Sequence, residues 1–128
     1  MEFENNAYFW QKLDTLYLSS DLVLDKPKGT VHKRFSNLVY PVDYGYFREV
    51  TDTDVEHIRV FKGSLKSTSV EAIVVCVDIL KKDIEVKLLV GCSPEEELSI
   101  LEFLNQTDFQ KAVVLRRGSG LPDWAMSV

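Results

Sequence analysis

The fold of this protein is decided by the segment VEAIVVCVDIL (residues 70–80), which is followed by KKD (81–83) and IEVKLLV (84–90). β-Branched residues dominate the first segment, which is typical of a strand that is buried on at least one face. The last segment alternates apolar and charged residues in its first half, and the polar segment between the two is typical of a turn. Together the three segments predict a β-hairpin. Because Glu85 and Lys87 are two residues apart in an extended chain, their side chains are expected on the same face.

A helix is predicted after this hairpin. Ser93 stands at the N-cap position, Pro94 lies in the first turn, and Glu96 completes a capping box. Apolar residues continue at helical spacing, and the helix is expected to end near Asn105. A last strand is predicted beyond it, at residues 112–115.

The N-terminal half is predicted to contain one helix and several short strands. Apolar residues recur at three- and four-residue steps over residues 7–18, which predicts an amphipathic helix that is capped by Asn5 or Asn6. Short strands are expected at residues 21–25, 38–40 and 58–61. Residues 39–47, which contain three tyrosines and a glycine, are interpreted as a bend.

Many short strands with a helix near each end predict an α+β protein that is mainly β. The specific expectation is a small OB-like β-barrel with an N-terminal helix and one C-terminal helix. A chain of 128 residues corresponds to a single domain, in which residues 118–128 are expected to form a loose tail.

The composition excludes several classes of function. Twenty acidic and fifteen basic residues give a formal net charge of −5, whereas a general nucleic-acid-binding protein carries a basic excess. No apolar run approaches the ~18 residues that a membrane span needs. The first residues have neither the basic nor the apolar region of a signal peptide. The sequence therefore predicts a cytoplasmic protein without nucleic-acid or membrane partners.

The two cysteines, Cys76 and Cys92, form neither a zinc-binding spacing nor a disulfide framework. Cys76 lies within the apolar strand and is expected in the core. Cys92 precedes the second predicted helix, where the helix dipole could lower the pKa of its thiol. Because no acid–base partner is near in sequence, Cys92 is interpreted as a small buried thiol.

The segment TDTDVEH (51–57) is the first candidate for chemistry, because it places three carboxylates and a histidine within six positions. Such carboxylates supply the oxygen ligands that Mg²⁺ and Ca²⁺ prefer. The twelve-residue calcium loop is excluded, since its glycine and its terminal glutamate are missing. A solvated surface loop is the alternative interpretation of this segment.

The hairpin contains the second candidate. The shared face of Glu85 and Lys87 could hold a metal ion and a phosphate oxygen side by side, or it could carry an ion pair worth under ~1 kcal/mol. The tyrosines of residues 39–47 are compatible with a ligand site and equally with an aromatic core.

Taken in order, five segments resemble the soluble inorganic pyrophosphatases of the β-barrel type. YPVDYGY (40–46) is similar to that family's Tyr-Pro-x-Asn-Tyr-Gly-Phe/Tyr segment at all positions but the asparagine. DTDVEHI (52–58) falls where the family carries its main magnesium loop, Asp-Gly-Asp-Pro-x-Asp-Val. EVKL (85–88) resembles the family's later Asp-x-Lys-Leu. DKP (25–27) resembles its strand-ending Glu-x-Pro, and Arg34 resembles the arginine of its Asp-Arg-Phe.

The resemblance covers about residues 21–90 and implies metal-dependent hydrolysis of inorganic diphosphate or of a related small phosphoanhydride. In such enzymes several Mg²⁺ ions polarise the diphosphate and activate the attacking water. The implied metal ligands are Asp52, Asp54 and Glu85, with Asp25 as an outer carboxylate and His57 at the third position of the loop. The implied phosphate-binding residues are Arg34, Tyr40 and Lys87, and the implied catalytic residues are Asp54 and Tyr44. Members of the family usually assemble, so a homo-oligomer is a further expectation.

Departures from the family's pattern predict an incomplete metal site. His57 replaces the third aspartate of the loop, and its nitrogen suits Mn²⁺ better than Mg²⁺. The family's Lys-x-Glu hairpin is replaced by KPKGT (26–30), and its C-terminal Tyr-Lys phosphate contacts have no counterpart. We therefore expect a short, divergent member with weak hydrolase activity. The alternative is a non-catalytic pyrophosphatase-like module that binds a phosphate ligand or a protein partner.

Overall fold

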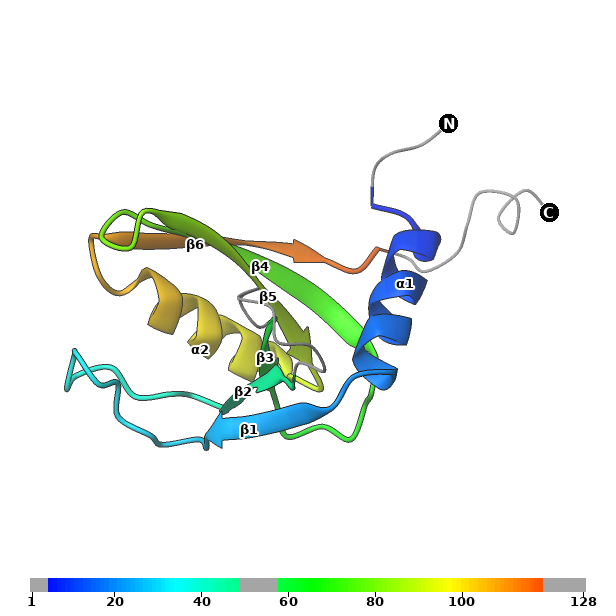
Figure 1. Ribbon diagram of the computed structural model, residues 1–128, viewed down its shortest axis with the longest axis horizontal. Coiled ribbons are helices and arrows are strands. Elements are labelled where there is room, and N and C mark those ends of the chain that lie inside the picture. Colours follow the sequence, from blue (N-terminus) through cyan, green and yellow to red (C-terminus); the bar gives the residue numbers. More distant parts are fainter. Residues whose placement is uncertain (1–4, 49–57, 119–128) are drawn as a thin grey trace.

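The computed structural model describes residues 5–48 and 58–118, which form two helices and six strands (Figure 1). In chain order these elements are α1 (Ala7–Leu18), β1 (Leu22–Lys26), β2 (Asp43–Phe47), β3 (Arg59–Lys62), β4 (Val70–Asp78), β5 (Asp83–Val90), α2 (Pro94–Asn105) and β6 (Gln110–Arg116). Both helices predicted from the sequence are confirmed, with the boundaries expected for them.

The six strands form one sheet in the order β1-β2-β3-β5-β4-β6. Neighbouring strands are antiparallel except β3 and β5, which pair in parallel. The sheet curves around α2, so that β1 and β6 lie on opposite sides of this helix (Figure 1). Within the described residues no pairing joins β1 to β6, so the sheet is open and the expected OB-like barrel is not confirmed. The protein is a mixed α/β structure that consists mainly of sheet.

The hairpin predicted from residues 70–90 is confirmed as the β4–β5 pair. The two strands pair from Val70 opposite Val90 to Asp78 opposite Asp83. Lys82 closes the turn with a φ of 58°, in the left-handed region. The two longest strands of the sheet are thus joined by a tight turn, as the polar segment between them predicts.

Local polar contacts explain where both helices begin. The side-chain oxygen of Asn6 accepts a hydrogen bond from the backbone nitrogen of Phe9 at 3.1 Å. At α2, the Ser93 hydroxyl accepts from the backbone nitrogen of Glu96 at 3.2 Å, and the Glu96 carboxylate accepts from the backbone nitrogen of Ser93 at 2.8 Å. This reciprocal pair is the capping box expected from the sequence, and it satisfies two backbone donors that the first helical turn leaves free.

The two helices cover opposite faces of the sheet. Successive residues of β4 divide between two apolar clusters, because side chains alternate along a strand: Val74 packs on the α2 side and Ile73 on the α1 side. The cluster under α2 includes Tyr40, Tyr44, Phe61, Cys76, Leu89, Ile100 and Leu104. The cluster under α1 includes Trp10, Phe47, Val60, Val70, Leu88 and Val90.

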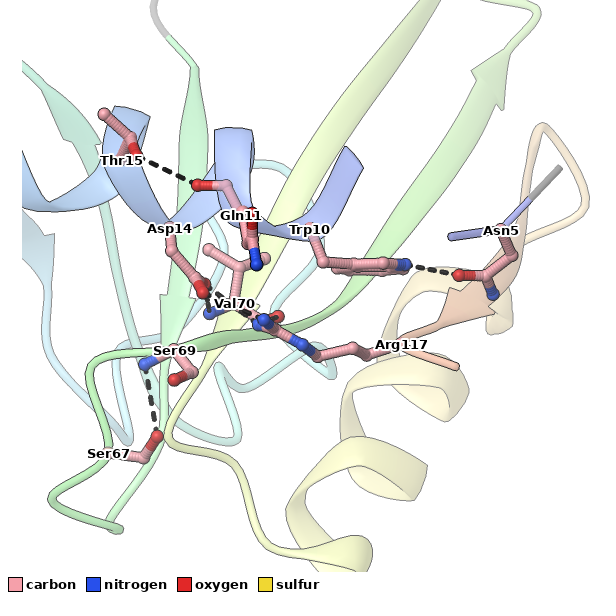
Figure 2. A network of polar contacts seen from close by, with 9 residues as sticks. All are labelled: Asn5, Trp10, Gln11, Asp14, Thr15, Ser67, Ser69, Val70 and Arg117. Atoms are coloured by element: carbon pink, nitrogen blue, oxygen red, sulfur yellow. Dashed lines mark hydrogen bonds and ion pairs between the residues drawn. The ribbon is translucent and has the colours of Figure 1, made fainter. Parts of the chain in front are cut away.

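Polar contacts attach α1 to the edge of the sheet (Figure 2). The Asp14 carboxylate on α1 accepts two hydrogen bonds from the Arg117 guanidinium, each of 3.0 Å, and a third from the backbone nitrogen of Val70 at 2.9 Å. Asn5 accepts a hydrogen bond from the indole nitrogen of the buried Trp10. The helix is therefore anchored both by apolar packing and by a bidentate ion pair to the chain just after β6.

Farther from α1, no helix or strand of the described residues covers the face of the sheet on which α1 packs. Val77, Ile84, Val86 and Val113 have between 45% and 69% of their surface exposed there. None of the helices formed by residues 5–48 and 58–118 is long and apolar enough to cross a membrane.

The chain between β1 and β3 differs from the prediction. Residues 38–40 form no strand, and the structure has only an isolated bridge between Val31 and Val39. The chain bends at residues 41–42, within the predicted bend, and residues 43–47 then form β2, which pairs with β1 and β3. The bend is therefore confirmed at Pro41 and Val42, whereas Asp43 and Gly45 belong to the strand.

Two of those residues make specific contacts from within β2. The Asp43 carboxylate accepts a hydrogen bond from the backbone nitrogen of Lys28 at 2.8 Å and thereby holds the preceding loop. Gly45 lies so close to the backbone of Val23 in β1 that a Cβ atom at this position would overlap its carbonyl oxygen. The glycine is thus required by close strand packing, and not by a turn.

Candidate functional site

A buried lysine on β5 is the centre of the candidate site. Lys87 is only 6% exposed. Its ammonium donates hydrogen bonds to the Tyr44 hydroxyl at 2.7 Å and to a carboxylate oxygen of Glu85 at 2.9 Å. The expected shared face of Glu85 and Lys87 is confirmed. The two side chains form a largely buried ion pair, and the same ammonium also bonds the tyrosine of β2.

The protonation states of these three groups follow from their contacts. Burial alone would lower the pKa of Lys87, but its bonds and charge interactions with Tyr44 and Glu85 outweigh burial and raise that pKa above its ordinary value. Burial raises the pKa of Tyr44. Burial also opposes ionisation of Glu85, yet the hydrogen bond and charge of Lys87 hold the pKa of this carboxyl below its usual range. At neutral pH the site therefore contains an ammonium, a neutral phenol and a carboxylate.

A pocket of about 330 Å³ opens above Lys87. Its walls come from all six strands, from the loop between β1 and β2, from the β4–β5 turn, and from the end of α2 and the turn after it. The charged residues that line it are Lys26, Lys33, Arg34, Arg59, Lys81, Lys87, Asp78, Asp83 and Glu85. Aromatic residues line it as well: His32, Phe35, Tyr40, Tyr44, Phe61, Phe103 and Phe109.

The charge of this pocket is opposite in sign to that of the whole chain. Six lysines and arginines line it against three carboxylates, whereas the chain carries a formal net charge of −5. One further carboxylate, Asp25, pairs with Lys26 at 3.1 Å and with Arg59 at 3.6 Å. Even with Asp25 included, the cations outnumber the carboxylates among the described residues. Such an arrangement attracts anions.

Arg59 on β3 extends the cationic surface of the site. Its guanidinium lies 5.5 Å from the centre of the Tyr44 ring and 5.4 Å from that of Tyr46, which are cation–π distances. Its Nη1 atom is buried and lies 3.6 Å from a carboxylate oxygen of Asp25, and within the described part of the chain it has no hydrogen-bond partner. Because a guanidinium has five N–H donors, Arg59 can contact an oxygen of a ligand in addition to Asp25.

Five of the residues singled out in the sequence lie together around this pocket: Arg34, Tyr40, Tyr44, Glu85 and Lys87. A sixth, Asp25, contacts Lys26 and Arg59 beside it. The remaining three, Asp52, Asp54 and His57, lie outside the described residues.

Sequence reasoning missed Arg59 and Lys81 as members of the site. From the sequence, Arg59 is predicted only as part of a short strand, and Lys81 only as part of a polar turn. The signal that identifies Arg59 is its pairing opposite Lys87, which exists only because β3 and β5 lie side by side in parallel. That pairing is not visible in the local pattern of either strand.

The described residues near the pocket offer few donor atoms for the expected metal ion. Within residues 5–48 and 58–118, no three histidine, cysteine or carboxylate side chains gather closely enough to hold a metal. Among the described residues, Glu85 is the one implied ligand that lines the pocket, and its carboxylate is already paired with Lys87. A magnesium site at this place therefore depends on Asp52 and Asp54 and stays a prediction.

Both cysteines are buried thiols. Burial raises the pKa of Cys76 to about 11 and, together with the nearby Glu71 and Glu96 carboxylates, raises the pKa of Cys92 to about 12. The interpretation of Cys92 as a buried thiol is confirmed, and a lowered pKa at the start of α2 is excluded.

No family model matches the sequence, and no curated protein is significantly similar to it.

Proposed function

We propose that this protein binds a small phosphate-containing anion, such as inorganic diphosphate, in the pocket above Lys87. The observation that carries the proposal is the excess of lysine and arginine side chains around a buried ammonium in an otherwise acidic chain. Lys87 has three N–H groups and, among the described residues, donates two of them to Tyr44 and Glu85, which leaves the third for an oxygen of the ligand.

The surrounding groups match the chemistry of a phosphate. Arg59 offers N–H groups from a planar guanidinium, which suits phosphate oxygens. Tyr40 remains a neutral hydroxyl donor, because burial raises its pKa to about 12. Lys26, Arg34 and Lys81 add positive charge at the wall of the pocket, where a polyanion such as diphosphate is attracted most strongly.

Calorimetric titration with sodium diphosphate tests this proposal. The wild-type chain is expected to bind one equivalent, and Lys87→Met is expected to weaken binding by about 10- to 100-fold, the worth of a charge-assisted hydrogen bond. Lys66→Met, which removes an exposed lysine that does not line the pocket, is the matched control and should leave the affinity unchanged. Absence of binding, or equal loss in the two variants, would contradict the proposal.

Metal-dependent hydrolysis of diphosphate is a second candidate function. Asp83 and Glu85 both line the pocket, and Oδ1 of Asp83 is buried without a hydrogen-bond partner in the described part of the chain. Together with Asp52 and Asp54 these carboxylates offer the oxygen donors that Mg²⁺ or Mn²⁺ requires. A bound metal would polarise the phosphoanhydride and lower the pKa of a water, while Lys87 and Arg59 would hold the phosphate oxygens.

An assay of phosphate release separates the two functions. With diphosphate and Mg²⁺ or Mn²⁺, a hydrolase releases orthophosphate, and Asp54→Ala is expected to remove most of this activity. A binding module instead gains thermal stability from diphosphate without any turnover. Release that continues unchanged in Asp54→Ala would contradict the implied metal loop.

A further inference from the structure

One end of the pocket is lined by aromatic rings that a bare phosphate does not use. Phe35 and Phe109 stack with ring centres 5.1 Å apart and planes inclined by 29°. Phe103 lies 4.8 Å from Tyr40, and His32 lies 5.4 Å from Phe35. Two of these five rings, Phe103 and Phe109, lie outside residues 21–90, the span of the resemblance to pyrophosphatases.

Four of these five rings are only partly buried. His32, Phe35, Phe103 and Phe109 are all half-buried, and each lines the pocket. They come from three separate segments: the loop before β2, α2, and the turn that leads into β6. Aromatic surface that several elements direct into one pocket is stabilised when a ligand covers it.

The aromatic end is continuous with the cationic end. The Tyr40 ring contacts Phe103 on one side and lies 5.2 Å from Tyr44 on the other. Tyr44 in turn accepts the hydrogen bond from Lys87 and has Arg59 beside its ring. A single ligand can therefore contact the cations with one part and the rings with another.

The size and the polar edge of this end favour a particular class of ligand. A volume of about 330 Å³ lies at the lower end of the range of ~300–1,000 Å³ for organic ligands, and a bare diphosphate would fill only part of it. Thr107 and Gln110 line the pocket beside Phe109 and can hydrogen-bond the edge of a planar ring. Burial and the cations Lys81, Arg34 and Lys26 lower the pKa of His32, so its imidazole is a neutral ring at neutral pH.

We propose that the pocket takes a nucleoside diphosphate, with the base against Phe35 and Phe109 and the phosphates against Lys87 and Arg59. This inference rests on the proposed anion binding and specifies its ligand. A base that stacks on an aromatic side chain gains roughly 10-fold or more in affinity, independently of the contacts to the phosphates.

Three probes distinguish the parts of this proposal: ADP, inorganic diphosphate and adenosine, each titrated by calorimetry without added metal. ADP is expected to bind at least 10-fold more tightly than diphosphate and to be displaced by diphosphate in competition. Phe35→Leu and Phe109→Leu keep the apolar volume but remove the flat ring. Each should abolish most of the preference for ADP while leaving diphosphate affinity unchanged.

Phe9→Leu, on the exposed side of α1, is the matched control and should keep the preference for ADP. A chain that binds diphosphate but shows no preference for ADP would overturn this inference and leave the anion-binding function standing. ADP that diphosphate does not displace would also overturn it. Binding of neither phosphate ligand, or of adenosine without diphosphate, would overturn the proposed function and this inference with it.

Discussion

The ammonium nitrogen of Lys87 lies 2.7 Å from the hydroxyl oxygen of Tyr44, although the two residues are 43 positions apart in the chain. Their strands are not neighbours, because β3 lies between β2 and β5 in the sheet. The lysine side chain thus reaches across β3, and its hydrogen bond links β2 to β5 beneath the pocket.

The first prediction concerns how much the contacts of Lys87 stabilise the protein. Lys87→Met leaves the Tyr44 hydroxyl and the Glu85 carboxylate without their partner, so the free energy of unfolding should fall by about 1.5–3 kcal/mol. The double variant Lys87→Met/Glu85→Gln should recover part of this loss, since it removes the unpaired charge as well. Urea unfolding of both variants measures the difference. A single variant as stable as the wild type would show that the ion pair does not stabilise the sheet.

The second prediction concerns the attachment of α1. Burial opposes ionisation of Asp14, but its bonds with Arg117 and with the backbone of Val70 lower the pKa of this carboxyl. Because the folded state holds the proton less tightly than the unfolded chain, its contribution is present above pH ~4 and disappears as the pH falls through the lowered pKa.

Asp14→Asn should therefore reduce the free energy of unfolding by about 1–2 kcal/mol at pH 7, and by progressively less below pH ~4. Urea unfolding at a series of pH values measures this change. Glu102→Gln, an exposed carboxylate on α2, serves as the control and should show little effect. A difference between Asp14→Asn and the wild type that does not change with pH would rule out the ion pair as its source.

The third prediction concerns the start of α2. Ser93→Ala removes the hydroxyl that accepts from the backbone of Glu96, and should lower stability by about 1 kcal/mol. Ser99→Ala, at an exposed position inside the same helix, should be neutral or slightly stabilising, since alanine has the higher helix propensity. Thermal melting of both variants provides the comparison, and equal melting temperatures would count against the cap.

The fourth prediction concerns the glycine of β2. Gly45→Ala places a methyl group into the carbonyl oxygen of Val23, so the β1–β2 pair must move apart and stability should fall by about 2 kcal/mol or more. Gly118→Ala meets its nearest atom at 3.5 Å, an ordinary contact, and is the control. Denaturant unfolding tests both, and a stable Gly45→Ala would show that the two strands are less closely packed.

The fifth prediction concerns the metal loop implied by the resemblance. His57→Asp replaces one nitrogen by a carboxylate at the third position of the loop and should increase the affinity for Mg²⁺. Titration calorimetry with Mg²⁺ compares the two chains. Unchanged affinity would mean that residue 57 does not face the site and that the alignment of this loop with the family's motif is wrong.

Much of the secondary structure could be predicted because its causes are local. The cap at Asn6, the capping box of Ser93 and Glu96, and the alternation along residues 70–90 each depend on neighbours within a few positions. Residues 43–47 could not be predicted in this way. Their glycine resembles a turn residue, and its actual cause is the backbone of Val23 in another strand.

The candidate site likewise has one part that local sequence predicts and another that depends on the tertiary structure. The sequence by itself determined that Glu85 and Lys87 share a face, because the direction of side chains along a strand has a period of two residues. Only the tertiary structure decided that Arg59 stands beside Lys87, that Tyr44 receives its hydrogen bond, and that phenylalanines complete the pocket. Which strands become neighbours depends on the burial of apolar faces summed over the whole chain, and no single segment contains that information.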